Sequence, residues 1–563
     1  MTSTTLPNAA YDADVFVAGG GPVGMALACE LGRRNLSVYI AEAKPGFHEH
    51  PRSTVINART MEVFRAWDMD EEAIQVAVPA DYALDVAFTH RLAGEEFWRL
   101  SYPTIAESRA RTPETLKKYP PLNWSRFGKM VIGQNHLEPV LYRALQRFPD
   151  VSMEFDTSVE SVEDLGDHVV ATVIGSDGQP RTVRSRYAVG CDGARSTVRK
   201  AMGISLSGAG DLGASVNIFF RAPDFLKEIG KDPAFLLWTF ASGATGSFFT
   251  IDGRDTWVHS RHLMPHETYE GFDPVAAIHA AVGKPIELEV ISHWPWVPRE
   301  LIADRYGVGR VFLAGDAAHL MSPTGGLGLN TGIGDIMNLG WKLHAAIDGW
   351  AGEGLLETYG IERRPIAVRN AEESTDNRRL MKISMMAGHR YDAGEPGARD
   401  ELIESLAAHD KHFDTPGLVF GDDYGDSPIC AAEPDGQARS TSFAPLPRAG
   451  WRLPDQWVNR DRTVHDLLGA NFALLCADAE KAAFISAAFA SHAVPLDIVR
   501  LTPEHMRAYE APLVLVRPDR HIAWRGDDVD ANWLVSVISG ALVGHVDEPA
   551  SVHEAGERCE GRF

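Results

Sequence analysis

The sequence lacks the features that would place it in an oxidising compartment or in a membrane. Its 563 residues hold only five cysteines, at Cys29, Cys191, Cys430, Cys476 and Cys559. No Cys-x-x-Cys pair occurs, which argues against a structural zinc site or a dithiol redox centre, so we expect no metal. No apolar run reaches the roughly 18–20 residues that cross a bilayer, and the first residues carry no basic segment before an apolar core. We therefore expect a cytoplasmic protein with reduced thiols and no membrane partner.

Positive charge is also scarce. The chain has 54 lysines and arginines against 77 aspartates and glutamates, a net charge of −23. This balance argues against nucleic acid or an anionic membrane as a partner. An anionic cofactor must then be bound by local features, such as helix N-termini, backbone N–H groups or particular arginines. The apolar fraction of 45% is typical of a globular protein, and the length suits two to four structural units.

Glycine, by contrast, is abundant, and its first cluster predicts a dinucleotide site. A buried strand (14–18) leads into Gly19-Gly20-Gly21-Pro22-Val23-Gly24 and a helix (25–31), and a second strand ends at Glu42. In such a unit the glycines allow a tight turn and close approach to a pyrophosphate, which the helix N-terminus faces. Glu42 can accept hydrogen bonds from a ribose. The unit alone does not distinguish FAD from NAD.

Two further glycine signatures follow at long intervals. A strand ends in Cys191-Asp192-Gly193, and a later hydrophobic strand ends in Gly315-Asp316. The loop from Pro323 to Asn330 then opens a helix with apolar residues at intervals of three and four. A helix that begins beside a flavin ring would stabilise the negative charge of the reduced ring.

Together the three signatures closely resemble the single-component flavoprotein aromatic hydroxylases, the family of p-hydroxybenzoate hydroxylase and phenol hydroxylase. The resemblance covers roughly residues 12–385. It includes the arginine segment at Arg52 and Arg59, the glutamine-bearing helix that begins at Gln134, and the segment from Tyr359 to Pro365. It implies an α/β fold. A Rossmann-like FAD-binding domain of the glutathione-reductase type is interleaved with a β-sheet substrate domain.

The resemblance also implies the cofactors and their contacts. FAD would be held noncovalently, NADPH or NADH would bind transiently as electron donor, and O2 would be the co-substrate. The expected FAD contacts are Gly19, Gly21, Pro22, Gly24, Glu42, Arg52, Gln134, Asp192, Asp316, Gly328, Leu329 and Asn330. The chain has no second Gly-x-Gly-x-x-Gly after a strand, which argues against a separate nicotinamide domain.

Residues 205–298 have the alternating and aromatic pattern of sheet strands, and the family places such a sheet over the flavin. Its expected substrate contacts are Trp238, Phe248 and Trp294, together with Pro323 of the third signature. The chemistry lies mainly at the flavin, and the sequence does not identify a catalytic residue. Arg52 and His259 are the candidates, and His262, Arg221 and Arg261 are further candidates for a base that deprotonates a phenol.

The C-terminal part resembles the thioredoxin-like tail of the phenol hydroxylase branch, without a dithiol pair. We expect it to be structural or to support a homodimer. Pro454-Asp455-Gln456-Trp457 departs from the Pro-His that this branch often has before a tryptophan. The predicted units are an FAD-binding domain (1–80, 125–204 and 299–385), a substrate domain (81–124 and 205–298), a helical connector (386–443) and a thioredoxin-like domain (444–563).

The predicted function is NAD(P)H-dependent hydroxylation of a phenolic or related aromatic ring by O2, through a flavin C4a-hydroperoxide. One alternative is a monooxygenase that acts on an aromatic polyketide or a ketone, by epoxidation or Baeyer–Villiger oxidation. A flavin-dependent halogenase would need Trp-x-Trp-x-x-Ile. The stretch Trp294-Pro295-Trp296-Val297-Pro298 lacks the isoleucine, and its prolines favour a turn. A non-enzymatic redox flavoprotein is the remaining alternative.

Overall fold

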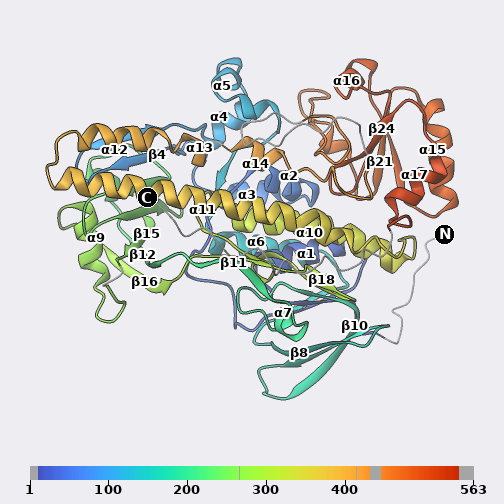
Figure 1. Ribbon diagram of the computed structural model, residues 1–563, viewed down its shortest axis with the longest axis horizontal. Helices are drawn as coiled ribbons and strands as arrows, with labels where there is room; N and C mark the ends of the chain where they lie inside the picture. The colour runs from blue at the N-terminus through green and yellow to red at the C-terminus, as the bar shows by residue number, and fades with distance from the viewer. Residues whose placement is uncertain (1–10, 265–266, 414, 432–445, 544–563) are drawn as a thin grey trace, which may run out of the picture.

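The structure is a computed structural model that describes residues 11–264, 267–413, 415–431 and 446–543. The predicted fold class is confirmed: an FAD-binding α/β unit is interleaved with a substrate sheet, and an α/β unit follows at the C-terminal end. In Figure 1 the C-terminal unit (red) lies at the opposite end of the molecule from the substrate sheet around β12 and β15 (green). Cys559 and parts of the predicted connector and tail lie outside the described residues.

The FAD-binding unit is built on a sheet of order β18-β19-β10-β1-β2-β7, with β9 pairing β10 and β8 pairing β9. Its strands are β1 (Ala13–Ala18), β2 (Val38–Ala41), β7 (Val151–Glu154), β8 (Ser158–Asp164), β9 (Val169–Ile174), β10 (Pro180–Gly190), β18 (Gly307–Val308) and β19 (Val311–Leu313). β1 runs parallel to both β2 and β10. Residues 15–18 are fully buried, as expected for a central parallel strand that is covered on both faces.

Helices pack on this sheet and connect it to the rest of the molecule. They are α1 (Pro22–Gly32), α2 (Ala58–Ala66), α3 (Asp70–Gln75), α6 (Gln134–Leu145), α7 (Thr197–Ala201), α10 (Leu327–Asp348) and the 3-10 turn η2 (Gly315–Ala317). Two small sheets are separate from the main one. β3 (Val55–Ile56) pairs with β6 (Met130–Val131), and a three-stranded sheet has the order β11 (Leu206–Asp211), β17 (Arg299–Ala303) and β20 (His319–Leu320). α1 packs against α10, where a Cβ on Gly340 would lie 2.6 Å from Cγ of Glu30.

The substrate sheet has the order β16-β12-β15-β14-β13-β4-β5. Its elements are β4 (Val86–Thr89), β5 (Glu96–Leu100), β12 (Ala214–Arg221), β13 (Leu236–Thr239), β14 (Gly246–Thr250), β15 (Thr256–Leu263), β16 (Glu289–Trp296), α8 (Phe225–Ile229) and α9 (Pro274–Val282). Near it lie α4 (Ile105–Ala110), α5 (Pro113–Lys118) and η1 (Pro120–Asn123). One face of the sheet, with Trp238 and Leu236, packs toward the FAD-binding unit, and the other face packs with α8 and α9 in a separate core.

The turn predicted from the prolines between Trp294 and Pro298 is wrong. Trp294, Pro295 and Trp296 form the end of strand β16, and Pro295 is paired with Val216 of β12. A proline is tolerated here because β16 is at the edge of the sheet, where one row of N–H groups has no neighbouring strand to bond.

The C-terminal unit consists of a sheet of order β22-β21-β23-β24 with helices on its face. Its elements are η3 (His465–Leu467), β21 (Phe472–Cys476), α15 (Ala479–Ser491), β22 (Leu496–Arg500), α16 (Pro503–Arg507), β23 (Leu513–Val516), β24 (Ile522–Gly526) and α17 (Ala531–Ile538). The strand β22 has a weak sequence signal. Asp497 interrupts its short apolar run, which weakens the strand signal.

A long helix, α11 (Thr358–Asp392), follows α10 and runs across the molecule toward the substrate sheet (Figure 1). Shorter helices then lead to the C-terminal unit: α12 (Ala398–Ala407), α13 (Asp410–Phe413) and α14 (Pro416–Phe420). All three lie within the predicted helical connector, residues 386–443. None of the described helices combines the length and apolarity that a bilayer crossing requires.

Candidate cofactor and substrate site

The first glycine turn has the local geometry of a pyrophosphate site. Gly19 has a φ of +98°, and a Cβ on Gly24 would lie 2.0 Å from the Gly19 carbonyl oxygen, so neither position tolerates a side chain. Gly21 has nothing within 4 Å of the place of its Cβ. It is also the N-cap of α1, has no side-chain cap, and is followed by Pro22 at the first helical turn. The uncapped end of α1 therefore faces open space, as anion binding requires.

Glu42 lies beside this turn. One carboxylate oxygen accepts a hydrogen bond from the Gly20 N–H at 2.7 Å and the other accepts from the Lys44 N–H at 3.0 Å. These bonds fix the carboxylate at the end of β2, next to the glycine turn. This is the position in which an acidic residue meets a ribose in dinucleotide folds.

Asp316 follows the short strand β19 within the turn η2. Its side chain is accessible to solvent, yet the surrounding protein raises the pKa of its carboxyl by desolvation, while His319 and Arg52 act in the opposite direction. The carboxyl group thus lies in a recess of the protein that solvent can enter, where it can accept hydrogen bonds from the hydroxyl groups of a ligand. The effect of Arg52 also shows that the arginine segment lies within electrostatic range of Asp316.

A fully buried aspartate, Asp335 of α10, holds the Asp316 turn in place, and the sequence reading missed it. Its carboxylate accepts from the Gly315 N–H at 3.2 Å, from His319 Nε2 at 2.7 Å and from Arg363 Nε at 3.0 Å. Burial alone would raise the pKa of Asp335, but His319 and Arg363 hold it below the ordinary value. Asp335 lies on the same helix as the third signature, but its partners are distant in sequence, so no local pattern identifies it.

The start of α10 is fixed by Asn330. Its amide oxygen accepts from the Asn57 N–H at 3.0 Å and from Thr60 Oγ1 at 2.7 Å, and its amide nitrogen donates to Val55 O at 3.0 Å and Gly326 O at 2.7 Å. The amide oxygen and the amide nitrogen of Asn330 are thus both bonded to groups of the protein. Gly328 and Leu329 remain partly accessible in the first turn, where their backbone can meet a ligand.

The other expected cofactor residues differ in their environment. Arg52 is exposed, and Gln134 is buried and donates to Glu138 Oε1 at 2.7 Å. Asp192 caps α7 by accepting from the Thr197 N–H at 2.7 Å, while its other oxygen is buried without a protein partner. That orphaned oxygen, close to the first glycine turn at Gly19, can accept a hydrogen bond from a ligand or water.

The face of the substrate sheet that packs toward the FAD-binding unit carries polar groups among aromatic rings. Trp238 is buried on this face with its indole N–H unpaired, and His262 stacks with it, ring centroids 6.3 Å apart. His262 Nδ1 lies 3.1 Å from Ser215 Oγ. Burial, followed by the charges of Arg378 and Arg261, lowers the pKa of His262 to about 4, so its imidazole is neutral at pH 7.

His50 connects the arginine segment to the same face of the sheet, and the sequence reading did not single it out. Its Nδ1 lies 2.8 Å from Ser292 Oγ, and its ring makes an edge contact with Phe219, centroids 6.0 Å apart. Burial and then Arg52 lower the pKa of His50 to about 4. The segment with Arg52 is therefore anchored to the substrate sheet rather than lying apart from it.

The structure does not bring the remaining candidates together. Phe248 and His259 stack on each other, centroids 3.9 Å apart, in the fully buried core with α8 and α9 on the opposite face of the sheet. His259 is enclosed there, because residue-by-residue alternation turns every second side chain of a strand to the other face. Trp294 is 62% exposed at the sheet edge, and Pro323 is exposed before α10.

The described residues fit FAD. The open, uncapped glycine turn suits a pyrophosphate, and Glu42, the accessible Asp316 and the orphaned oxygen of Asp192 offer acceptors for hydroxyl groups. The N-terminus of α10 begins at Gly326 without a side-chain cap, so its N–H groups can face the electron-rich edge of a flavin. These features come from segments far apart in sequence.

Comparison with known proteins gives the same assignment. A family profile described as "FAD binding domain" matches residues 12–374, and one described as "Aromatic-ring hydroxylase, C-terminal" matches residues 446–542. A putative polyketide hydroxylase of Streptomyces halstedii is 32% identical, over 91% of this chain and 93% of its own. The rebeccamycin biosynthetic enzyme RebC, solved with bound 7-carboxy-K252c, superimposes with a TM-score of 0.85 at 34% identity, over 94% of this chain and 99% of RebC.

A third similar protein, aklavinone-11 hydroxylase solved with FAD and aklavinone, has a TM-score of 0.79 at 28% identity, over 94% of this chain and 99% of its own. Fold, site and comparisons together define an FAD-dependent monooxygenase. The chain belongs to the single-component FAD-dependent aromatic hydroxylases, with the aromatic-ring hydroxylase C-terminal domain.

Proposed function

We propose that this enzyme hydroxylates a phenolic or related aromatic ring, with NADPH or NADH as electron donor and O2 as co-substrate. The balance is one ring C–H, O2, NAD(P)H and a proton converted to one ring C–OH, water and NAD(P)+. Bound FAD supplies the redox chemistry, accepting hydride and activating O2. The observation that carries the proposal is the polar, aromatic face of the substrate sheet, which packs toward the FAD-binding unit.

In this proposal the chain's own residues hold the cofactor and keep it oriented. Gly19, Gly21, Pro22 and Gly24 border the pyrophosphate, and Glu42 accepts from the ribose. The remaining proposed contacts are Arg52, Gln134, Asp192, Asp316, Gly328, Leu329 and Asn330. Asn330 acts through its backbone, since its side chain is engaged by Asn57, Thr60, Val55 and Gly326.

The substrate's hydroxyl group is proposed to meet His262. With Nδ1 turned to Ser215, the imidazole presents Nε2 toward a phenol's proton. Its lowered pKa keeps it unprotonated but makes it a weak base, so the phenolate needs a positive charge beside it. Arg378 of α11 contributes to the lowered pKa of His262 and donates to Leu212 O at 2.9 Å. Among the described residues its guanidinium has no carboxylate partner, so its charge can stabilise the phenolate.

Several relatives favour a polycyclic ring system, although others are named for single-ring phenols. RebC binds 7-carboxy-K252c and aklavinone-11 hydroxylase binds aklavinone, and the Streptomyces halstedii relative is described as a polyketide hydroxylase. An aromatic polyketide is therefore the proposed substrate class, and hydroxylation is the proposed reaction on it. Trp238 is the proposed stacking residue, because its ring lies beside His262.

The test is anaerobic reduction of the purified, FAD-loaded enzyme by NADPH and by NADH, with and without a panel of phenols and polycyclic phenols. We expect one class of phenol to accelerate flavin bleaching. In air, the same compound should yield a product heavier by one oxygen atom. Bleaching that no phenol accelerates, with no oxygenated product, would contradict the proposal.

His262→Asn then tests the proposed base. We expect kcat to fall on the order of 10²- to 10⁴-fold with unchanged FAD affinity, the range for a lost general base. Ser215→Ala is the matched variant: it removes only the group that orients the imidazole, so its loss should be smaller. Full activity of His262→Asn across the pH range would rule this residue out as the base.

We also infer a homodimer formed through the C-terminal unit. Phe484 of α15 and Trp533 of α17 are 39% and 44% exposed, and the two helices pack side by side. Light scattering on the wild type and on the Phe484→Ser/Trp533→Ser variant tests this. We expect a dimer for the former and a monomer for the latter, and a wild-type monomer at micromolar concentration would refute it.

A further inference from the structure

A pocket with a surplus of positive charge lies between α2 of the FAD-binding unit and the C-terminal unit, away from the cofactor turn at Gly21. Its volume is about 280 Å³, and the arginines that line it are Arg59, Arg65, Arg126, Arg462 and Arg520. Such a concentration of guanidinium groups is unexpected in a chain with a net charge of −23. The volume is near the lower limit of typical small-molecule sites, about 300 Å³, and therefore suits a compact ligand.

The carboxylates of this pocket are already shared among arginines. Glu62 accepts from Arg59 Nη1 at 3.1 Å and from Arg452 Nη2 at 2.5 Å. Asp466 accepts from Arg65 Nε at 3.2 Å and from Arg126 Nη1 at 2.6 Å. Glu62 and Asp466 are thus each paired with two guanidinium groups. Asp68 and Asp455 also line the pocket, so its five arginines face four carboxylates, and Arg452 behind Glu62 adds a sixth guanidinium, which leaves a small net positive charge.

Two guanidinium groups have no acidic partner in the described part of the chain. Arg520 is 5% exposed, and its guanidinium donates from Nη2 to Leu468 O at 2.7 Å. Burial, followed by the neighbouring charges of Arg33 and Arg59, lowers the pKa of Arg520 to about 9. Arg462 is exposed, in contrast to Arg520. It also lines the pocket and has no acidic partner among the described residues. A buried cation without a counter-charge is costly, and a bound anion removes that cost.

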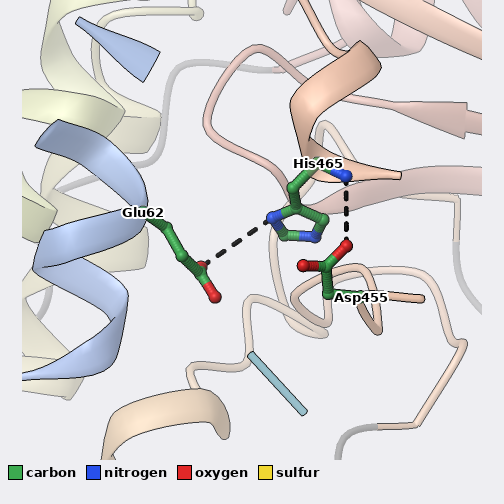
Figure 2. A group of neighbouring side chains, drawn as sticks. All are labelled: Glu62, Asp455 and His465. Atoms are coloured by element: carbon green, nitrogen blue, oxygen red, sulfur yellow. Dashed lines mark hydrogen bonds and ion pairs between the residues drawn. The ribbon is translucent and has the colours of Figure 1, made fainter. Parts of the chain in front are cut away.

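A cluster of Glu62, Asp455 and His465 at the wall of this pocket has the residue types of a metal site (Figure 2). His465 Nε2 lies 2.9 Å from Leu453 O, and its Nδ1 is buried 3.8 Å from the Glu62 carboxylate. However, both oxygens of Glu62 already accept from arginines, and Asp455 accepts from the His465 N–H at 3.1 Å. A divalent cation here would be repelled by Arg59 and Arg452, whereas an anion would be attracted.

We propose that this pocket is a second binding site, distinct from the cofactor and substrate site, for a small multiply charged oxyanion that bears phosphate or carboxylate groups. Arg520 and Arg462 are its principal contacts, and Arg59 and Arg126 add charge at its wall. Guanidinium groups bind such oxyanions through paired N–H donors of matching geometry. Because Arg59 is fixed on α2 and donates to Asp519 O of the C-terminal unit at 2.7 Å, the ligand would bridge the two units.

The test is equilibrium binding of pyrophosphate and, separately, of citrate to the full-length, FAD-loaded enzyme by calorimetry at constant ionic strength. The two probes distinguish a phosphate from a carboxylate ligand. We expect saturable 1:1 binding of at least one probe, with a Kd below about 1 mM. Arg462→Gln should weaken that binding at least about tenfold, the effect of one charge-assisted hydrogen bond, and Arg520→Gln should weaken it more.

Arg460→Gln is the matched control, because Arg460 is exposed on the same segment and does not line the pocket. It should bind the probe as the wild type does. If Arg520→Gln fails to fold, the exposed Arg462→Gln still decides the question. Absence of saturable binding by either probe, or equal binding by Arg462→Gln and Arg460→Gln, would overturn the proposal.

Discussion

Single buried charges determine how the residues around the cofactor turn are held. Asp335 is the clearest case, since it receives the Gly315 N–H, His319 and Arg363 in a fully buried site. Removing one partner of such a cluster leaves the others buried and uncompensated, which costs more than the pair itself contributes. The cofactor turn thus depends on a residue that has no direct contact with the surface.

We predict that Asp335→Asn destabilises the protein by about 3 kcal/mol and weakens FAD binding, because His319 and Arg363 lose their shared buried carboxylate and Arg363 keeps only Asp422 as an acidic partner. Urea unfolding and the fluorescence of released flavin measure the two effects. Asp348→Asn is the control, since Asp348 lies on the same helix, its side chain is 48% exposed, and it pairs with His344 at the surface. Equal stability of the two variants would contradict the role given to Asp335.

Asp455 gives a pH-dependent prediction. Burial, followed by the charge of Glu62, raises the pKa of Asp455 to about 7. The ionised carboxylate is therefore less favourable in the folded protein than in the unfolded chain, which lowers the free energy of unfolding. Because the folded pKa lies above the unfolded value of 3.8, wild-type stability falls as pH rises from about 4 to about 7.

Asp455→Asn removes this penalty while keeping the amide oxygen as acceptor. The variant should be more stable than wild type by on the order of 2 kcal/mol above pH 7, with the gap disappearing near pH 4. Chemical unfolding at several pH values checks this. A stability gap independent of pH would show that Asp455 is not the titrating group.

At the residue scale, the sequence predicts the glycine signatures but not the buried residues that hydrogen-bond to them and fix their position. Gly21, Glu42 and Asp316 sit in patterns whose spacing reflects a local turn, so a sequence can reveal them. Asp335 acts through partners 16 to 28 residues away, and His50 through one 242 residues away, which only the fold brings close. His259 and His262 are three residues apart on one strand, and alternation alone placed one in the far core and the other on the cofactor side.

At the scale of elements, the sequence predicts where α10 begins but not which contacts hold its first turn in place. The third signature predicts a helix after a glycine loop, and the structure has it. The sequence reading assigned Asn330 to the flavin edge, whereas its side chain ties α10 to β3 and α2. Similarly, prolines near Trp294 predict a turn, but the edge position of β16 accommodates Pro295 within a strand.

We predict that Asn330→Ala weakens FAD binding about tenfold and lowers stability by about 2 kcal/mol, because several backbone and hydroxyl groups lose their partner together. Titration of the apoenzyme with FAD and thermal unfolding measure both. Asn330→Asp keeps the acceptor for Asn57 and Thr60 but turns a carboxylate oxygen toward the carbonyl oxygens of Val55 and Gly326, so its loss of stability should not be smaller than that of Asn330→Ala. FAD affinity unchanged in Asn330→Ala would refute the positioning role.

At the scale of the whole molecule, the C-terminal unit is docked by a buried charge network rather than by apolar contact alone. Arg517 donates to both oxygens of Glu362, at 2.5 and 2.7 Å, and to Asp519 Oδ2 at 2.6 Å. Lys342 Nζ donates to the same glutamate at 2.6 Å. The segment from Tyr359 to Pro365, which holds Glu362, can be recognised from the sequence, but its meeting with Arg517 cannot, because the two residues are 155 positions apart in the chain.

This network predicts an asymmetry between breaking and replacing the pair. Arg517→Met alone should cost about 3–5 kcal/mol and increase cleavage between the units by protease, because Glu362 is left facing fewer cations in a dry interface. Arg517→Met combined with Glu362→Gln should cost less than the sum of the two single losses, since each single variant already breaks the Arg517–Glu362 pair. The measurement is a double-mutant cycle by chemical unfolding. If the losses of the two single variants simply add, the two side chains do not act as a pair, and the docking of the C-terminal unit must rest on its apolar contacts with Trp341 and Leu355.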